Sequence, residues 1–452
     1  MTENPYKDFS RWELPVFPCA DISSALESGF TQDGIYQIKL ADEMTLDVLV
    51  QNAKALRSAR DALVGFNGAV TQREKKKGPF FSGTSVTKGI AVPSISFSDP
   101  TLDIDGQIGL AWYAGCERVP DLPQKIAEIL NGLASLYDLK LILFGGSGAG
   151  FAVLNISPHL KASHVALVWN PQTRIVKYFT RFVEKYVKSG FPQLWARMYN
   201  KTVYKEKGAE AFLSSVLSKA GVVHELGRGG VNERGQVLYL QNRHDWHTET
   251  HADPFLVQFG PWEKVGPAAY LAIDKRIGVV LGDWGEGHAA PPRKVIYELL
   301  DFCVGCKDIF SKGTHGVFSL FDEESSCPWM LCDEPSSVSQ AVAPRPDIAP
   351  EPQTSLRERA LKLDVVYSRS TSELLVELSL HHADYKKNNF VYAFYLMING
   401  VRAQTRWYEN RPYAAFGLAE LPLDVDIEII GFVKLASGII QRVRRRIDIH
   451  QT

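Results

Sequence analysis

The sequence predicts an α/β protein built on a doubly wound, mostly parallel sheet, followed by an antiparallel β-sandwich module. Between residues 60 and 305, buried apolar strands alternate with helical patterns, as in parallel sheets that are covered on both faces. After residue 355 the pattern changes to short strands with no helix between them. A chain of 452 residues is long enough for two or three domains.

The elements of the first part follow one another at short intervals. Asp121 can cap a helix that has Pro123 in its first turn and an apolar face made by Ile126, Ile129, Leu130 and Leu133. A further helix is predicted over residues 291–302. Strands are predicted over residues 61–67, 91–99, 139–144, 163–170, 235–242 and 276–283.

One connection stands out by its length. The segment 174–230 is longer than a plain crossover needs and is rich in Phe, Tyr and Trp. Two interpretations remain open: a helical cap over a site, and an elaborate crossover.

A Pro-, Ser- and Ala-rich segment, residues 333–355, predicts a linker between a first domain, 1–332, and a module, 356–452. Asn399-Gly400 predicts a two-residue hairpin within the module. The module's aromatic residues could stack on sugar rings or pack structurally; they are Tyr392, Phe394, Tyr395, Trp407, Tyr408, Tyr413 and Phe416. Its last strand carries Arg442, Arg444, Arg445 and Arg446, which suit an anionic glycan or the protection of an edge strand.

The composition excludes several classes of protein. Lys plus Arg number 50 and Asp plus Glu 51, so the net charge of -1 gives no signal for nucleic acid. No apolar run reaches the roughly 18 residues that span a bilayer, and the first residues do not resemble a secretory signal. With six cysteines and no disulfide pattern, we expect a reducing, cytoplasmic setting. No feature predicts an oligomeric state.

The sharpest motif is LILFGGSGAGFAVL, residues 141–154, in which a buried strand leads through glycines into an apolar helix. A nucleophile elbow needs this arrangement, with Ser147 on a strained turn and small residues, Gly145 and Ala149, two positions before and after it. The helix N-terminus suits a developing oxyanion. A phosphate-binding loop and a plain turn are the alternatives, and the missing Lys-Ser/Thr pair weakens the first.

A reactive serine needs a base and a carboxylate that orients it. Asp245 follows the strand 235–242, and His288 follows the strand 276–283, in the order Ser, Asp, His. The rivals of Asp245 are Asp253, Asp283 and Glu286. In HDWHTETH, the histidines 244, 247 and 251 could instead hold a metal or contact a substrate.

The loop FNGAV offers a second set of oxyanion donors beside the N–H of Gly148. The N–H groups of Gly68 and Ala69 and the side chain of Asn67 are the candidates. An ordinary Asn-Gly turn is the other interpretation.

Two cysteine pairs, Cys303 with Cys306 and Cys327 with Cys332, resemble a four-thiolate zinc site. Free buried thiols explain them as well, because the first pair ends a predicted helix and the second spacing is unusual.

Residues 60–305 resemble the α/β-hydrolase superfamily in GGSGAG, the two strand exits and the FNGAV loop. The resemblance implies Ser147 as nucleophile, His288 as base and Asp245 as its orienter, with no cofactor and no catalytic metal. Two features depart from the family's common pattern. The elbow has Ala149 where Gly is commoner, and the candidate oxyanion loop is FNGAV in place of an HGG-type loop. The β-sandwich and WNPQT, 169–173, resemble bacterial proteins of surface-polysaccharide and glycoprotein modification, some of them O-acetyltransferases or deacetylases.

The function expected from these residues is serine-dependent acyl-ester chemistry through an acyl-serine, as an esterase, a deacetylase or an O-acyltransferase. The substrate would be an acyl ester or a glycan. The alternative is a non-catalytic scaffold or secretion accessory protein that kept the fold, because a fold alone does not prove activity.

Overall fold

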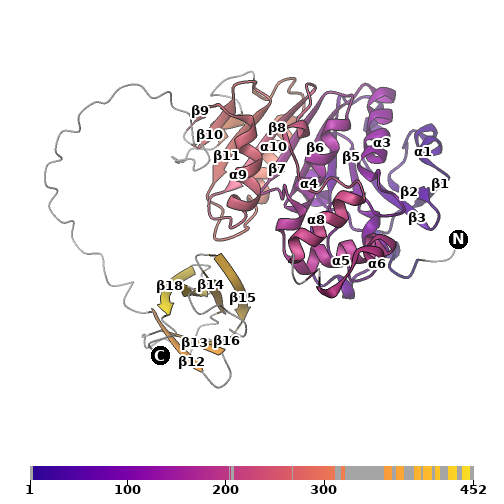
Figure 1. Ribbon diagram of the computed structural model, residues 1–452. Coiled ribbons are helices and arrows are strands. Elements are labelled where there is room, and N and C mark those ends of the chain that lie inside the picture. The colour runs from indigo at the N-terminus through magenta and orange to yellow at the C-terminus, as the bar shows by residue number, and fades with distance from the viewer. Residues whose placement is uncertain are drawn as a thin grey trace, which may run out of the picture. The chain divides into compact units, whose positions relative to one another are not determined.

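The computed structural model describes residues 4–202, 204, 208–266, 268–310, 317–320, 361–368, 373–380, 391–398, 401–409, 413–417, 426–434 and 440–447. The chain divides into two compact units, Met1–Val338 and Ser339–Thr452 (Figure 1). The predicted linker 333–355 lies outside the described residues.

One large sheet organises the first unit, with the strand order β1-β2-β3-β5-β4-β6-β7-β8-β11-β10-β9. The strands are β1 (Val16–Cys19), β2 (Gly34–Ala41), β3 (Met44–Gln51), β4 (Asp61–Phe66), β5 (Ser94–Ser98), β6 (Lys140–Gly146), β7 (His164–Trp169), β8 (Gly235–Asn242), β9 (Trp262–Gly266), β10 (Ala269–Ala272) and β11 (Ile277–Gly282). From β5 to β11 all neighbours are parallel. The order from β2 to β11, with β3 antiparallel to its neighbours, is that of the α/β-hydrolase fold, so the predicted fold class is confirmed.

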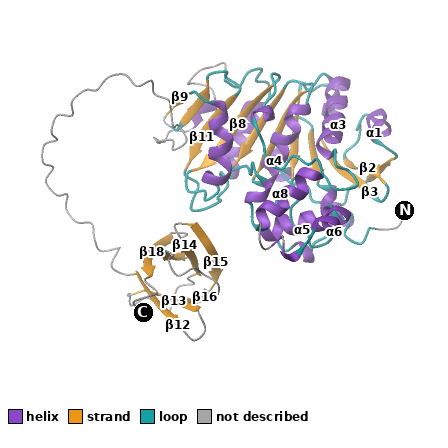
Figure 2. Cartoon of the chain, in the orientation of Figure 1, coloured by secondary structure: helices purple, strands orange, loops and turns teal. Residues whose placement is uncertain are grey.

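The central strands are apolar on both faces because both faces are covered. Figure 2 shows helices alongside the strands of the large sheet. One face packs mainly on α1 (Ile22–Ser28), α3 (Leu122–Tyr137) and α4 (Gly148–Ile156), and the other on α10 (Arg293–Cys303). On β6, for example, Leu141 and Leu143 belong to the first core and Ile142 to the second. None of the helices among the described residues is long and apolar enough to cross a membrane.

The segment 174–230 is largely helical. It contains α5 (Thr180–Gly190), α6 (Pro192–Met198) and α8 (Ala209–Lys219). Two shorter helices are α2 (Thr84–Thr87) and α9 (Asp253–Leu256). Asp121 stands at the N-cap of α3, but its side chain makes no capping hydrogen bond, contrary to expectation.

Five strands of the large sheet are not among those predicted from the sequence. β1, β2 and β3 extend the sheet on one edge, and β9 and β10 extend it on the other. β9 is mostly exposed or half-buried, and β10 has only four residues. Strands this short or this exposed carry too little apolar pattern to be recognised locally, whereas β2 and β3 have eight residues each and are mostly buried.

The second unit is an antiparallel sandwich, as predicted, with seven strands among its described residues. Its sheets are β12-β13-β16 and β15-β14-β17-β18, with β12 (Leu361–Ser368), β13 (Glu373–Leu380), β14 (Val391–Ile398), β15 (Val401–Glu409), β16 (Tyr413–Gly417), β17 (Ile427–Lys434) and β18 (Ile440–Ile447). Ile398 pairs with Val401, which is the register of the predicted hairpin. Tyr392, Phe394 and Phe416 are buried in the core between the sheets.

Candidate active site

Ser147 lies between β6 and α4 in a strained conformation, with φ 56° and ψ −123°. A side chain rarely adopts a positive φ, so the surrounding residues must hold it there. A Cβ at Gly145 would lie 2.8 Å from Cβ of Ala149, which confirms that strand and helix nearly touch on either side of the serine. The turn has the geometry of a nucleophile elbow.

Gln172 is the hydrogen-bond partner of the serine hydroxyl. Its Nε2 donates to Ser147 Oγ at 3.0 Å, and its Oε1 accepts from Trp112 Nε1 at 2.5 Å. An indole N–H can only donate, so the end of Gln172 that faces Trp112 must be the oxygen. The bond to Ser147 therefore uses the acceptor side of Oγ and leaves the serine's own hydrogen available for donation.

Asp245 and His288 meet although they follow different strands. His288 Nδ1 lies 2.8 Å from Asp245 Oδ2. The Asp245 side chain is 1% exposed and that of His288 is 24% exposed. The pair joins a buried acceptor to an imidazole that is open on one side, which suits a base held in one orientation.

The loop that carries His288 is fastened to the end of β8. Asn242 Nδ2 donates to Gly285 O at 2.7 Å and to Gly287 O at 2.8 Å, and its Oδ1 accepts from Trp284 N at 3.1 Å. Both glycines have positive φ, which lets the loop turn back toward β8. The buried Asn170, in the WNPQT segment, donates to Ala289 O at 2.7 Å beyond the histidine. His288 is thus held on both sides.

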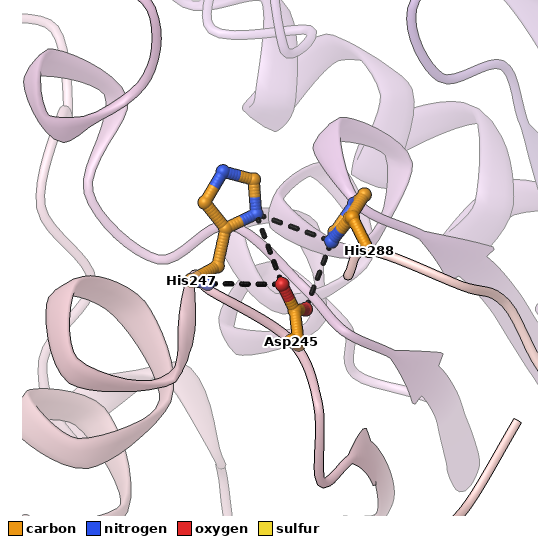
Figure 3. A group of neighbouring side chains, drawn as sticks. All are labelled: Asp245, His247 and His288. Atoms are coloured by element: carbon orange, nitrogen blue, oxygen red, sulfur yellow. Dashed lines mark hydrogen bonds and ion pairs between the residues drawn. The ribbon is translucent and has the colours of Figure 1, made fainter. Parts of the chain in front are cut away.

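A second histidine joins this pair (Figure 3). The backbone N–H of His247 donates to Asp245 Oδ1 at 2.9 Å, and His247 Nδ1 lies 3.1 Å from His288 Nδ1. His247 is buried. The sequence pattern grouped His247 with His244 and His251, whereas the structure brings it to His288.

The other members of the HDWHTETH pattern have different partners. His251 Nδ1 accepts from Thr173 N at 3.2 Å, and burial lowers the pKa of His251 to about 3. His244 is exposed, with Nε2 3.3 Å from Asp283 Oδ1. The rival acid Asp283 is therefore occupied by His244, while Asp245 contacts His288.

The oxyanion loop lies beside the elbow, since a Cβ built on Gly68 would be 3.6 Å from Gly146 O. The Asn67 side chain is held within the loop: Nδ2 donates to Gly68 O at 3.0 Å, and Oδ1 accepts from Asp99 N at 3.1 Å. Within the described chain the N–H groups of Gly68 and Ala69 donate to no acceptor. Gly148 begins α4, where the N–H lies outside the helical pairing.

A cavity of about 440 Å³ adjoins the same loop. Its lining includes Gly68 and Ala69 together with Arg11, Lys76 and Phe80, and it does not include Ser147 or His288. The N-terminal segment thus forms part of a hollow next to the N–H groups of Gly68 and Ala69.

Aromatic residues at the start of the segment 174–230 contact the site. The ring centroids of Tyr178 and His247 are 5.6 Å apart, and those of Phe179 and Trp246 are 5.2 Å apart. The segment therefore reaches the histidine cluster, as a cap would.

The cysteine pattern is described only in part. Cys303 is fully buried at the end of α10, and burial raises the pKa of its thiol to about 12. Cys306 Sγ contacts Asp308 O at 3.4 Å. Cys327 and Cys332 lie outside the described residues.

No family model matches the sequence, and no curated protein matches it. Among solved structures, the capsule O-acetyltransferase of Neisseria meningitidis serogroup A is 11% identical, with 59% of this chain and 92% of that chain covered and a TM-score of 0.38. The S-formylglutathione hydrolase from Agrobacterium tumefaciens is 13% identical, with 59% and 91% covered and a TM-score of 0.32. At these values neither similarity carries an argument, and the fold assignment rests on strand order.

Proposed function

We propose that the first unit is a serine-dependent enzyme of acyl-ester chemistry that forms an acyl-serine at Ser147. The observation that carries the proposal is the pairing of a strained serine elbow with an Asp245–His288 contact of 2.8 Å at the ends of two later strands. This combination is the α/β-hydrolase arrangement of nucleophile, base and orienting acid.

The reaction has two stages, acylation of Ser147 and transfer of the acyl group to water or to an acceptor hydroxyl. Ser147 Oγ attacks the ester carbonyl carbon while Nε2 of His288 takes the hydroxyl proton, and the N–H groups of Gly148, Gly68 and Ala69 stabilise the oxyanion. As the ester bond breaks, His288 gives the proton to the leaving oxygen. Water or an acceptor hydroxyl then attacks the acyl-serine, losing its proton to His288, and Ser147 Oγ takes that proton back as it leaves.

Asp245 has the role of an orienting acceptor in this scheme. By accepting from Nδ1 of His288, it keeps the lone pair of the imidazole on Nε2 and stabilises the imidazolium that forms. Gln172 is a positioning residue, since its amide hydrogen binds a lone pair of Oγ and leaves the hydroxyl proton free for transfer.

For the substrate we propose an ester of a bacterial surface polysaccharide or glycan, with hydrolysis and transfer to a sugar hydroxyl as the two forms of the reaction. The support is the pairing of this hydrolase fold with a β-sandwich unit and the WNPQT segment. Both forms share the acyl-serine and differ only in the nucleophile that reaches it. Incubation with an acyl donor, with and without a glycan acceptor, separates them by the product.

A second candidate is a non-catalytic scaffold or secretion accessory protein. The observation that favours it is that Ser147 Oγ bonds to Gln172, while no hydrogen bond joins Ser147 to His288 within the described residues. A serine that never reaches its base would not react.

Labelling with a fluorophosphonate separates the two candidates. We expect the folded chain to be labelled at Ser147, located by mass spectrometry, and we expect Ser147→Ala to lose labelling and about 10⁶-fold in turnover. The matched control is Ser215→Ala, which changes an exposed serine on α8. Unlabelled folded protein, or turnover that survives Ser147→Ala, would favour the scaffold.

A further inference from the structure

Three side chains of the kinds that bind zinc converge just past the ends of β8 and β11 (Figure 3). His247 Nδ1 and His288 Nδ1 are 3.1 Å apart, His288 Nδ1 is 2.8 Å from Asp245 Oδ2, and His247 Nδ1 is 3.7 Å from Asp245 Oδ1. Ligands at about 2.0–2.1 Å from a tetrahedral Zn²⁺ are about 3.3 Å from one another. The separations of 2.8, 3.1 and 3.7 Å lie around this value, with Asp245 presenting Oδ2 to His288 and Oδ1 to His247.

The protons of the cluster lead to the same conclusion. Two N–H groups cannot face each other across 3.1 Å, so only one of the two Nδ1 atoms carries hydrogen. An ionised Asp245 can only accept. The three atoms thus share one proton, with one nitrogen as its donor and the other two atoms as acceptors, whereas a divalent cation would bind a lone pair of each.

The ligands are also held in place before any ion arrives. Asp245 accepts from His247 N at 2.9 Å and from Gln241 Nε2 at 3.3 Å. Hydrogen bonds of this kind fix the direction of metal ligands. The Asp245 and His247 side chains are 1% and 4% exposed, and the partly open His288 gives a route for entry and for a water as fourth ligand.

We propose that Asp245, His247 and His288 form a binding site for Zn²⁺ whose occupation switches the serine off. The inhibitory part rests on the proposed function; the binding part does not. Zn²⁺ on Nδ1 of His288 replaces the proton shared with Asp245, and that proton moves to Nε2 through solvent. Nε2 then has no lone pair to accept the Ser147 proton. The ion is an inhibitor in this scheme and takes no part in the reaction.

The binding test uses the full-length chain freed of metal and titrated with Zn²⁺ and with Co²⁺. We expect one equivalent of Co²⁺ to give tetrahedral ligand-field bands without thiolate charge transfer, since the site has nitrogen and oxygen ligands. That spectrum distinguishes it from the cysteine pairs. His247→Phe should weaken binding at least about 10-fold.

The matched control is His244→Phe, which changes a neighbouring exposed histidine outside the cluster and should bind as the wild type does. If His247→Phe does not fold, His247→Asn tests the same ligand. Absence of the bands, or equal binding by the His247 variant and the wild type, overturns the site.

The activity test measures the rate of fluorophosphonate labelling with and without Zn²⁺. The ion should slow labelling of the wild type, and the residual labelling of His247→Phe should no longer depend on it. If the chain binds the ion but is never labelled, the proposed function is refuted and the Zn²⁺ site is supported. If the chain is labelled but its binding of Zn²⁺ does not depend on His247, the Zn²⁺ site is refuted and the proposed function is supported.

Discussion

His288 Nδ1 lies 2.8 Å from Asp245 Oδ2 although the residues are 43 positions apart and leave different strands. The contact exists because β8 and β11 are parallel neighbours, so their carboxyl ends meet at one edge of the sheet. Asn242, the last residue of β8, then fixes the His288 loop with three hydrogen bonds.

Asp245→Asn should reduce acylation of Ser147 by about 10⁴-fold with the fold intact. The new amide would donate to Nδ1 of His288 and place the imidazole proton on Nε2, the wrong tautomer for a base. Single-turnover labelling measures the loss. Asp283→Asn, which changes the exposed rival beside His244, should label at the wild-type rate; an equal loss in both variants would contradict the assignment.

The centre of the fold and the three proposed residues were predictable because they depend on local signals. Buried parallel strands such as β6 are continuous apolar runs, and the elbow adds glycines where backbones touch. Asp245 and His288 follow their strands within a few residues. The contact between them follows from the order of the parallel strands, since β8 and β11 are neighbours.

The partners of His247 and Gln172 could not be predicted, because they depend on contacts between residues that are distant in the sequence. His247 lies four residues before His251, a spacing that suggests a shared metal, yet His251 Nδ1 is taken by Thr173 and His247 turns to His288. Gln172 lies within the WNPQT segment. Its bond to Ser147 depends on Trp112, 60 positions away, because the indole N–H of Trp112 fixes the orientation of the Gln172 amide. No local pattern records such pairs.

Gln172→Glu should slow acylation about 100-fold and affect kcat more than KM. The new carboxylate keeps the bond from Trp112 but presents an acceptor to Ser147 Oγ in place of a donor, at nearly the same volume. Gln258→Glu is the matched control, because this half-buried residue of the 3-10 helix Val257–Phe259 likewise donates its amide hydrogen, to Pro254 O at 2.7 Å. Wild-type kcat in Gln172→Glu would show that the donor does not position the serine.

Gly145→Ala should lower the free energy of unfolding by about 1–3 kcal/mol and slow labelling. The added Cβ would lie 2.8 Å from Ala149 Cβ and 2.9 Å from its carbonyl, so the elbow must shift. Urea unfolding measures the first effect. At Gly229 a Cβ meets nothing within 4 Å, and Gly229→Ala should leave both quantities unchanged. Equal stability of the two variants would exclude the close approach of strand and helix.

The last prediction concerns Asp99, whose backbone N–H holds the Asn67 side chain of the oxyanion loop. Burial raises the pKa of Asp99 from 3.8 to about 6, against hydrogen bonds from Tyr113 N and Thr101 N, because the carboxylate loses its water. Between these values the folded protein keeps a proton that the unfolded chain has released. The resulting stability is complete below about pH 3.8 and is lost as the pH rises through about 6, at about 1.4 kcal/mol per pH unit.

Asp99→Asn removes this titration, since the amide resembles the protonated carboxyl at every pH. The measured quantity is the free energy of unfolding of the wild type minus that of the variant. This difference should be about 3 kcal/mol larger at low pH than at neutral pH. Urea unfolding at several pH values between about 4 and 7 measures the difference. Asp138→Asn, which changes an exposed carboxylate on the surface, should follow the wild-type pH profile throughout. If Asp99→Asn follows it too, Asp99 is already ionised across this range in the folded protein.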